Sequence, residues 1–387
     1  MFFGLLHINP RSSSAKPRML HRVPANSFFL VLSLITASVQ ICATAEPVAA
    51  STESDPAAVL YLIGDAGLAE SESPVIVQLR SDLRSIPDAT PVAVAFLGDN
   101  IYPRGLRTEA PYHTRDRNHL DAQIEIVRGS SATGIFLPGN HDWDNSGDQG
   151  LARLAAQEDY LATQASQGVA TTMLKPQGGC PGPETMRLGD ACLLVFLDTQ
   201  WWLHRYQRGR EACSSVTKEQ VIDELGAILR DTKLPAIVLG HHPLETQGPH
   251  RGSFWRHVLH WFVPRNQDLP NPKYKKMRTA LIELFQEFDD QPLIYAAGHD
   301  HSLQIFDGAS YGVAGLVLVS GSGSKLSEVE QAPQLRFSAG RSQGEMGYMK
   351  LEFYADGAIY LKAFTAGIGE EGVPIKRMRY EISVQSR

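Results

Sequence analysis

The sequence predicts an α/β protein in which helices cover the faces of β-sheets. Short apolar runs rich in Val, Ile and Leu, without strict alternation, are typical of strands that are buried on both faces. These runs are residues 59–63, 92–97, 135–137, 193–197, 237–239, 293–297 and 316–319. Stretches with apolar residues at helical spacing lie between them, at residues 75–86, 119–127, 151–162, 221–229 and 279–288. Because strands and helices alternate along the chain, we expect layers of helix on sheet.

Two of these elements carry specific boundary signals. Thr217 followed three residues later by Gln220 is a capping box at the start of the helix predicted over residues 221–229. Near the end of the chain, residues 348–354 and 358–364 flank Asp356 and Gly357, which predicts a β-hairpin. We expect this hairpin to form the edge of a sheet and not a second domain.

The N-terminal segment differs in charge and hydropathy from the rest of the chain. Residues 1–45 contain four basic side chains and no acidic one, then the apolar run 28–35, and they end in Ala43-Thr44-Ala45, a small-x-small cleavage pattern. The apolar run is shorter than the roughly 18 residues that a membrane-spanning helix needs, so a cleaved signal peptide is favoured over an anchor. A flexible lead-in over residues 46–57 and a single domain over residues 58–387 should follow. We expect an exported protein, either periplasmic or secreted.

The composition excludes several classes of protein. With 43% hydrophobic and 20% charged residues among 387, the chain is not a disordered, collagenous or multi-span membrane protein. Beyond residue 45 it holds 32 basic and 42 acidic side chains without a long block of like charge, so we expect no nucleic-acid binding. Of the three cysteines beyond residue 45, Cys192 begins an apolar strand and should stay free. Cys180 and Cys213 lie in polar surroundings and are the pair that we expect to form a disulfide.

Five of the predicted strands end in glycine followed by a side chain that can bind a metal ion. The motifs are GD-x-G at residues 64–67, GDNIY at 98–102, GNHD at 139–142, GHHP at 240–243 and GHDH at 298–301. Ligands of open α/β sheets bind beyond the carboxyl ends of the strands, so this repetition brings distant segments to one place. Carboxylate, amide and imidazole groups together suit Zn, Fe or Mn.

In this order the motifs resemble those of the calcineurin-like metallophosphoesterase superfamily, and within it the small, tartrate-resistant type of purple acid phosphatase. The resemblance covers about residues 58–325 and implies a four-layer sandwich of two face-to-face mixed β-sheets flanked by helices. The implied ligands of a first metal ion are Asp65, Asp99, Tyr102 and His301. Those of a second are Asn140, His241, His299 and the bridging Asp99. A tyrosine three residues after Asp99 implies the purple type, with Fe(III) beside a divalent Fe, Zn or Mn ion.

The resemblance implies hydrolysis of small-molecule phosphomonoesters by a hydroxide held at the dinuclear centre. His141 and His242, each adjacent to an implied ligand, are the candidate catalytic residues that stabilise charge on phosphoryl oxygens or protonate the leaving group. At position 242 the family usually has an aromatic residue, so this histidine departs from the pattern. A phosphodiesterase or nucleotidase of the same superfamily is the alternative, and a non-catalytic exported metal-binding protein is a further one.

Two segments near the motifs have no counterpart in this scheme. The long connection 244–278 contains Phe254, Val258, Trp261 and Phe262 at helical spacing. We expect this stripe to form part of an active-site wall, with membrane contact through residues 254–262 as the alternative. Residues 321–325, Gly-Ser-Gly-Ser-Lys, lack the spacing of a phosphate-binding P-loop and should line the edge of the site. The sequence predicts no oligomeric state.

Overall fold

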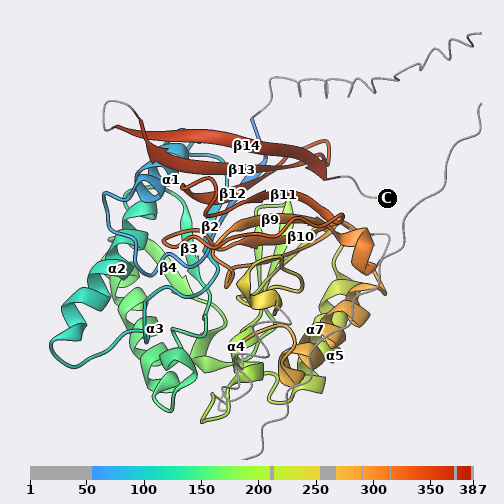
Figure 1. The fold of residues 1–387 in the computed structure, drawn as a ribbon, viewed down its shortest axis with the longest axis horizontal. Coiled ribbons are helices and arrows are strands. Elements are labelled where there is room, and N and C mark those ends of the chain that lie inside the picture. The colour runs from blue at the N-terminus through green and yellow to red at the C-terminus, as the bar shows by residue number, and fades with distance from the viewer. Residues whose placement is uncertain are drawn as a thin grey trace, which may run out of the picture. The chain divides into compact units, whose positions relative to one another are not determined.

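A computed structural model describes residues 55–209, 213–252, 267–288, 291–313, 315–369 and 373–384. All of them belong to one compact unit, residues 53–387. The described residues form two sheets of seven strands each, which lie face to face (Figure 1).

The first sheet combines both ends of this unit. Its strands, from one edge to the other, are β14 (Pro374–Val384), β13 (Ile359–Ile368), β12 (Met346–Phe353), β1 (Ala58–Ile63), β2 (Val92–Phe96), β3 (Thr133–Phe136) and β4 (Thr171–Leu174). Strands β1 to β4 are parallel to one another, whereas β12, β13 and β14 pair antiparallel. The C-terminal part of the chain therefore extends a sheet that the N-terminal part begins.

The second sheet comes from the middle of the chain. Its strands, in order, are β11 (Leu335–Ala339), β9 (Leu303–Asp307), β10 (Gly315–Ser320), β8 (Leu293–Ala297), β7 (Ala236–Leu239), β6 (Cys192–Phe196) and β5 (Glu184–Leu188). Strands β6, β7, β8 and β10 are parallel, β5 and β9 run against them, and β11 pairs antiparallel with β9. The strands that carry the metal-competent motifs at their carboxyl ends, β1, β2, β3, β7 and β8, all belong to these parallel sets.

Helices cover the outer face of each sheet (Figure 1). On the first sheet they are α1 (Pro74–Arg84), α2 (Tyr112–Val127) and α3 (Gly150–Ser166), and on the second α4 (Thr199–Leu203), α5 (Lys218–Asp231) and α7 (Pro272–Phe285). Short 3-10 helices occur at η1 (Asp144–Ser146), η2 (Gln177–Gly179), η3 (Pro249–Arg251) and η4 (Gly308–Tyr311). The α/β fold predicted from the sequence is confirmed.

The central strands show why they lack alternation of polar and apolar residues. In β1, Ala58, Leu60 and Leu62 pack against the second sheet, whereas Tyr61 and Ile63 pack against the helices on the other side. All six residues of the strand are buried. A strand covered on both faces needs an apolar side chain at every position, which is the pattern that the sequence carries.

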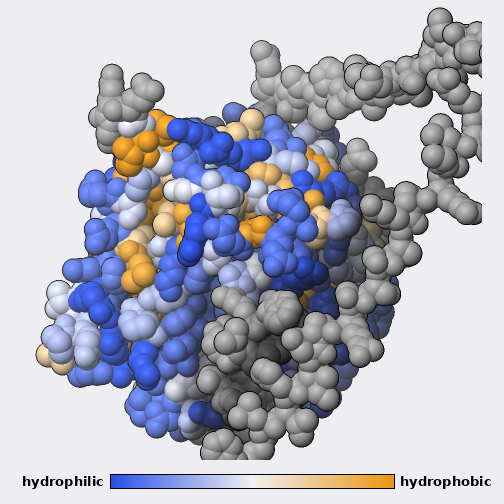
Figure 2. Space-filling model, viewed as in Figure 1, coloured by the Kyte–Doolittle hydropathy of each residue, from blue (hydrophilic) through white to orange (hydrophobic). Residues whose placement is uncertain are grey.

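Every predicted strand and helix is present, and the capping box of Thr217 and Gln220 opens α5. The hairpin around Asp356 is also present, between β12 and β13. It does not form the sheet edge, however, because β14 continues the sheet beyond it. Figure 2 shows a mainly hydrophilic surface with small hydrophobic patches. The exposed Ile368 belongs to β13 and the exposed Met378 to β14.

The structure contains the predicted disulfide between Cys180 and Cys213, and Cys192 is free and buried. A disulfide is typical of an oxidising compartment. Among the described helices none is both long and apolar enough to cross a bilayer. The expectations for residues 1–45 and 254–262 lie outside the described residues.

Candidate metal centre

The backbone bends sharply at the strand ends that carry the motifs. Asp65, Asp99 and His299 have φ values of 59°, 55° and 71°. This is a left-handed backbone conformation that residues other than glycine seldom adopt. Such strained residues tend to cluster at functional sites, where the surrounding structure holds them. The loops also lie very close together, since a Cβ on Gly139 would be 2.2 Å from the backbone nitrogen of Asp99. Glycine is required there because the two motif loops touch.

Two histidines are held so that their unprotonated nitrogens face each other. His241 donates its Nδ1 proton to the carbonyl oxygen of Leu97 at 2.8 Å, and His299 donates its Nε2 proton to the carbonyl oxygen of Gln267 at 2.8 Å. A carbonyl oxygen only accepts, so the proton of each neutral ring lies on the outward nitrogen. The inward nitrogens, Nε2 of His241 and Nδ1 of His299, are 3.2 Å apart, and each is 3.1 Å from Oδ1 of Asn140.

Three lone pairs therefore converge on one point without a hydrogen atom between them. Burial lowers the pKa of His241 and lowers that of His299 well below its ordinary value, which favours the neutral form of both rings. Metal binding requires neutral imidazole, and a carbonyl acceptor on the other ring nitrogen is the arrangement that orients a ligating histidine. Facing acceptors repel one another, and a cation at their centre would turn this repulsion into attraction. The residues present thus fit a metal ion.

A second group of donors adjoins the first. The hydroxyl of Tyr102 donates to Oδ1 of Asp65 at 2.8 Å, and Nε2 of His301 lies 3.3 Å from that hydroxyl and 3.6 Å from the same carboxylate oxygen. Donor atoms of Asp65, Asp99 and His241 all lie within 4.8 Å of one another. Asp99 therefore stands between the two groups, where a bridging carboxylate would be needed.

The two carboxylates are unequal in acidity. Burial and the charge of Asp99 raise the pKa of Asp65. Burial also acts to raise the pKa of Asp99, but the neighbouring His241 and His141 lower it to about 2. Burial and the two carboxylates raise the pKa of Tyr102, so its phenol is protonated and donates to Asp65. Coordination of Tyr102 would require a cation strong enough to displace that proton.

Residues 321–325 pack against this group. The backbone nitrogen of Gly323 donates to the carbonyl oxygen of Gly64 at 3.0 Å, and the ammonium of Lys325 lies 3.0 Å from the centre of the Tyr102 ring. The carboxylates of Asp65 and Asp99 act on Lys325 as nearby opposite charges. This loop thus adds a cation beside the two carboxylates.

The two candidate catalytic histidines have different surroundings. His141 lines a cavity of about 380 Å³ over the site, and its Nδ1 donates to the carbonyl oxygen of Pro103 at 2.7 Å. Its Nε2 is 3.8 Å from Oδ2 of Asp99. His242 is fully buried and does not line this cavity. Its Nδ1 is 2.8 Å from the hydroxyl of Thr199, and its Nε2 is 2.6 Å from Oε1 of Gln267, so both ring nitrogens are engaged.

His250 also lines the cavity, and the motifs do not reveal it. Its ring lies 4.0 Å from that of His299, and its Nδ1 is 2.8 Å from a carboxylate oxygen of Asp268. Burial lowers the pKa of His250, but the hydrogen bond to Asp268 and the charge of Asp300 outweigh this and raise it. His250 lies in the long connection after the GHHP motif, where no local pattern distinguishes it from the other histidines of that segment.

No protein-family model and no curated protein matches the sequence. Among solved structures, GAP50, the anchor in the inner membrane complex of Plasmodium, aligns with a TM-score of 0.52 and 16% identity over 85% of this chain and 89% of its own. PhoD aligns with a TM-score of 0.54 and 13% identity over 85% of this chain and 70% of its own.

At such identities the likeness shows the fold alone. That fold is the metallophosphoesterase sandwich of two mixed sheets flanked by helices, so the predicted architecture is confirmed. The resemblance to calcineurin-like metallophosphoesterases holds as a structural similarity. The narrower resemblance to purple acid phosphatases stays a prediction.

Proposed function

We propose that this chain is an exported, metal-dependent phosphoesterase that hydrolyses phosphomonoesters of small molecules. One observation carries the proposal: the lone pairs of His241, His299 and Asn140 converge beside the buried pair Asp65 and Asp99. Two adjacent groups of hard and borderline donors under an open cavity suit two cations about 3.5–4 Å apart, the arrangement used by many phosphatases. The disulfide supports the exported part of the proposal.

The ligand assignment follows the two groups of donors. The first ion would be held by Asp65, Asp99, Tyr102 and His301, and the second by Asp99, Asn140, His241 and His299. The phenol of Tyr102 favours Fe(III) in the first position, with a divalent Fe, Zn or Mn ion in the second. When bound, the ions supply Lewis acidity that polarises the phosphoryl group and makes water more acidic.

His141 and His250 supply the proton chemistry. Each ring is anchored through Nδ1, to the carbonyl oxygen of Pro103 in one case and to Asp268 in the other, so each has Nε2 left for the substrate. His250, whose carboxylate partner raises its pKa, holds a proton for the leaving oxygen. His141, beside Asp99, donates a hydrogen bond to a phosphoryl oxygen.

His242 acts as a positioning residue and not as a catalytic one. Its Nε2 proton is donated to the side-chain oxygen of Gln267, and the backbone oxygen of the same Gln267 accepts from His299. The buried ring of His242 therefore fixes Gln267, and through it the orientation of His299. This role revises the catalytic assignment made from the sequence.

The test is hydrolysis of p-nitrophenyl phosphate and bis(p-nitrophenyl) phosphate by purified protein loaded with iron and zinc. The wild-type protein should hydrolyse the monoester faster, and Asp99→Asn should lose activity because the bridging charge disappears. His113→Ala serves as the matched control, since His113 is a half-buried histidine of α2 away from the site. Preference for the diester would support the phosphodiesterase alternative. Metal binding without turnover of either ester would contradict the proposal.

A further inference from the structure

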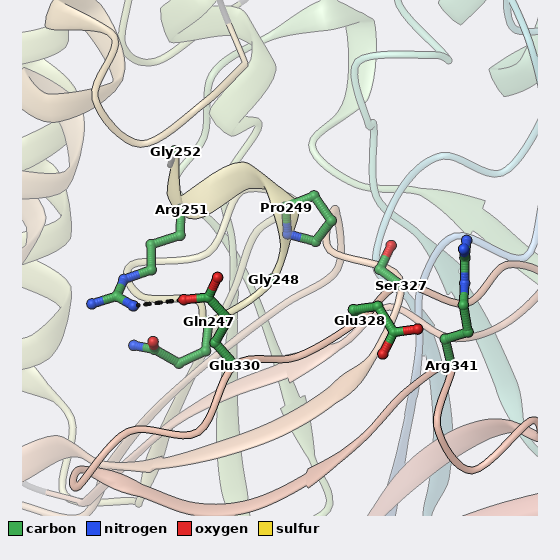
Figure 3. A pocket seen from close by; sticks show the side chains of 9 residues that line it. All are labelled: Gln247, Gly248, Pro249, Arg251, Gly252, Ser327, Glu328, Glu330 and Arg341. Atoms are coloured by element: carbon green, nitrogen blue, oxygen red, sulfur yellow. Dashed lines mark hydrogen bonds and ion pairs between the residues drawn. The ribbon is translucent and has the colours of Figure 1, made fainter. Parts of the chain in front are cut away.

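A second cavity, of about 570 Å³, opens beside the candidate metal centre. Figure 3 shows Gln247 and Arg251 on one side of it and Ser327, Glu328 and Arg341 on the other. None of these residues takes part in the proposed metal binding or proton transfer. The cavity is therefore a feature that the proposed function leaves unexplained.

The two cavities are lined by residues that are neighbours in the structure. His250 lines the first cavity, and its neighbour Arg251 in the short helix η3 lines the second. On the other wall, the backbone nitrogen of Ser327 donates to the carbonyl oxygen of His301 at 2.7 Å. His301 lines the first cavity and Ser327 the second. The second cavity therefore lies close enough to the metal centre for a group attached to a bound phosphate to be directed towards it.

Gln247 is the most informative lining residue. It is 1% exposed, and within the described part of the chain neither its amide oxygen nor its amide nitrogen has a hydrogen-bond partner. The backbone is firmly held, since its nitrogen donates to the side-chain oxygen of Gln304 at 2.7 Å and its carbonyl oxygen accepts from the backbone nitrogen of Glu330 at 2.9 Å. A buried amide without partners is unusual in folded proteins. Its amide nitrogen can donate to a ligand, and its amide oxygen can accept from one.

The charges around the cavity balance. Arg251 pairs with Glu330 at 3.4 Å, and a guanidinium nitrogen of Arg341 donates to the carbonyl oxygen of Leu326 at 3.1 Å. With Glu328, the lining residues within the described part of the chain include two basic and two acidic side chains and no aromatic ring. Such a wall suits a neutral ligand with many hydrogen-bonding groups better than an aryl group or a second anion.

We propose that this cavity binds the alcohol part of the substrate, and that the substrate is the phosphate monoester of a polyhydroxylated alcohol such as a sugar. The inference rests on the proposed function and specifies its substrate class. A hydroxyl group both donates and accepts, so it can satisfy both atoms of the Gln247 amide, whereas a phenyl ring can satisfy neither.

The experiment compares glucose 6-phosphate with phenyl phosphate in the metal-loaded protein, with inorganic phosphate as a competitive inhibitor. Gln247→Leu should lower kcat/KM for glucose 6-phosphate by about tenfold or more, because a site built to bind hydroxyl groups loses its partner. The value for phenyl phosphate and the inhibition constant of phosphate should stay within about twofold of wild type. Gln167→Leu, at an exposed glutamine after α3, is the matched control.

Arg341→Gln, on the exposed opposite wall, tests the same selectivity without altering a buried residue. It should also lower kcat/KM for glucose 6-phosphate more than kcat/KM for phenyl phosphate. An equal loss for both substrates, or an unchanged ratio in both variants, would overturn the inference and leave phosphomonoesterase activity standing. Absence of turnover for both substrates in the wild-type protein would instead overturn the proposed function.

Discussion

Metal binding should raise the thermal stability of the folded chain, and the size of the effect can be worked out. The acceptor atoms of His241, His299 and Asn140 lie 3.1–3.2 Å apart only in the folded state, because they come from three separate motifs. An ion that binds only the folded form adds about 2.7 kcal/mol to the free energy of unfolding at 100 times its Kd. Removing it should cost the same amount.

The corresponding change in melting temperature follows from the size of the unit. An unfolding entropy of about 2.1 cal/mol/K per residue gives roughly 0.7 kcal/mol/K for residues 53–387. The expected rise in Tm is then about 4 °C at 100 times Kd, and about 6 °C at 1,000 times Kd. The rise should depend on metal concentration, as mass action requires.

The assay is differential scanning calorimetry of chelator-treated protein, with and without added zinc. His299→Ala should abolish most of the shift, since one of the three converging lone pairs is removed, whereas His113→Ala should retain it in full. Equal Tm values with and without metal in the wild-type protein would refute the reasoning. A full shift in His299→Ala would show that the ion binds elsewhere.

Three further predictions concern individual side chains of the site. Tyr102→Phe should abolish the visible absorption of the iron-loaded protein, because the phenolate that would give the colour is lost; an unchanged spectrum would contradict coordination by Tyr102. His250→Ala should reduce hydrolysis of an alkyl phosphate about 10²- to 10⁴-fold, the usual effect of a positioned general acid, but should affect p-nitrophenyl phosphate much less because its leaving group needs little protonation. His141→Ala should reduce both rates by similar factors, and a similar reduction of both rates by His250→Ala would contradict its role as the acid.

The sequence predicts the central elements and misses those at the margins for a common physical reason. Strands such as β1 and β8 are buried along their whole length, so they appear as continuous apolar runs. The edge strand β14 is partly exposed and carries Lys376, Arg377 and Arg379, which hides any apolar pattern. Charged side chains on an edge strand discourage pairing with other chains. The same lysine and arginine residues that protect this edge therefore make the strand hard to recognise in the sequence.

The same contrast applies to the site. The residues of the five motifs could be placed together because the carboxyl ends of parallel strands meet at one edge of a sheet. His250 and Gln267 could not, because their positions depend on contacts with Asp268, His242 and His299, which only the folded chain creates. The surroundings of His242 could not be predicted for the same reason, since adjacency to His241 in the sequence does not reveal that its ring is buried between Thr199 and Gln267.

The position of β1 has a consequence for how the chain folds. Val59 pairs with Val92 of β2 on one side and with Glu352 of β12 on the other. The first sheet therefore cannot close until nearly all of the chain has been synthesised, and contacts between residues so far apart in sequence slow folding. A nascent chain that ends before β12 would leave β1 with an open edge, a template for pairing with other chains. The proposed metal donors follow β1, β2 and β3 in the first sheet and β7 and β8 in the second, so the complete set comes together only when the two sheets pack face to face.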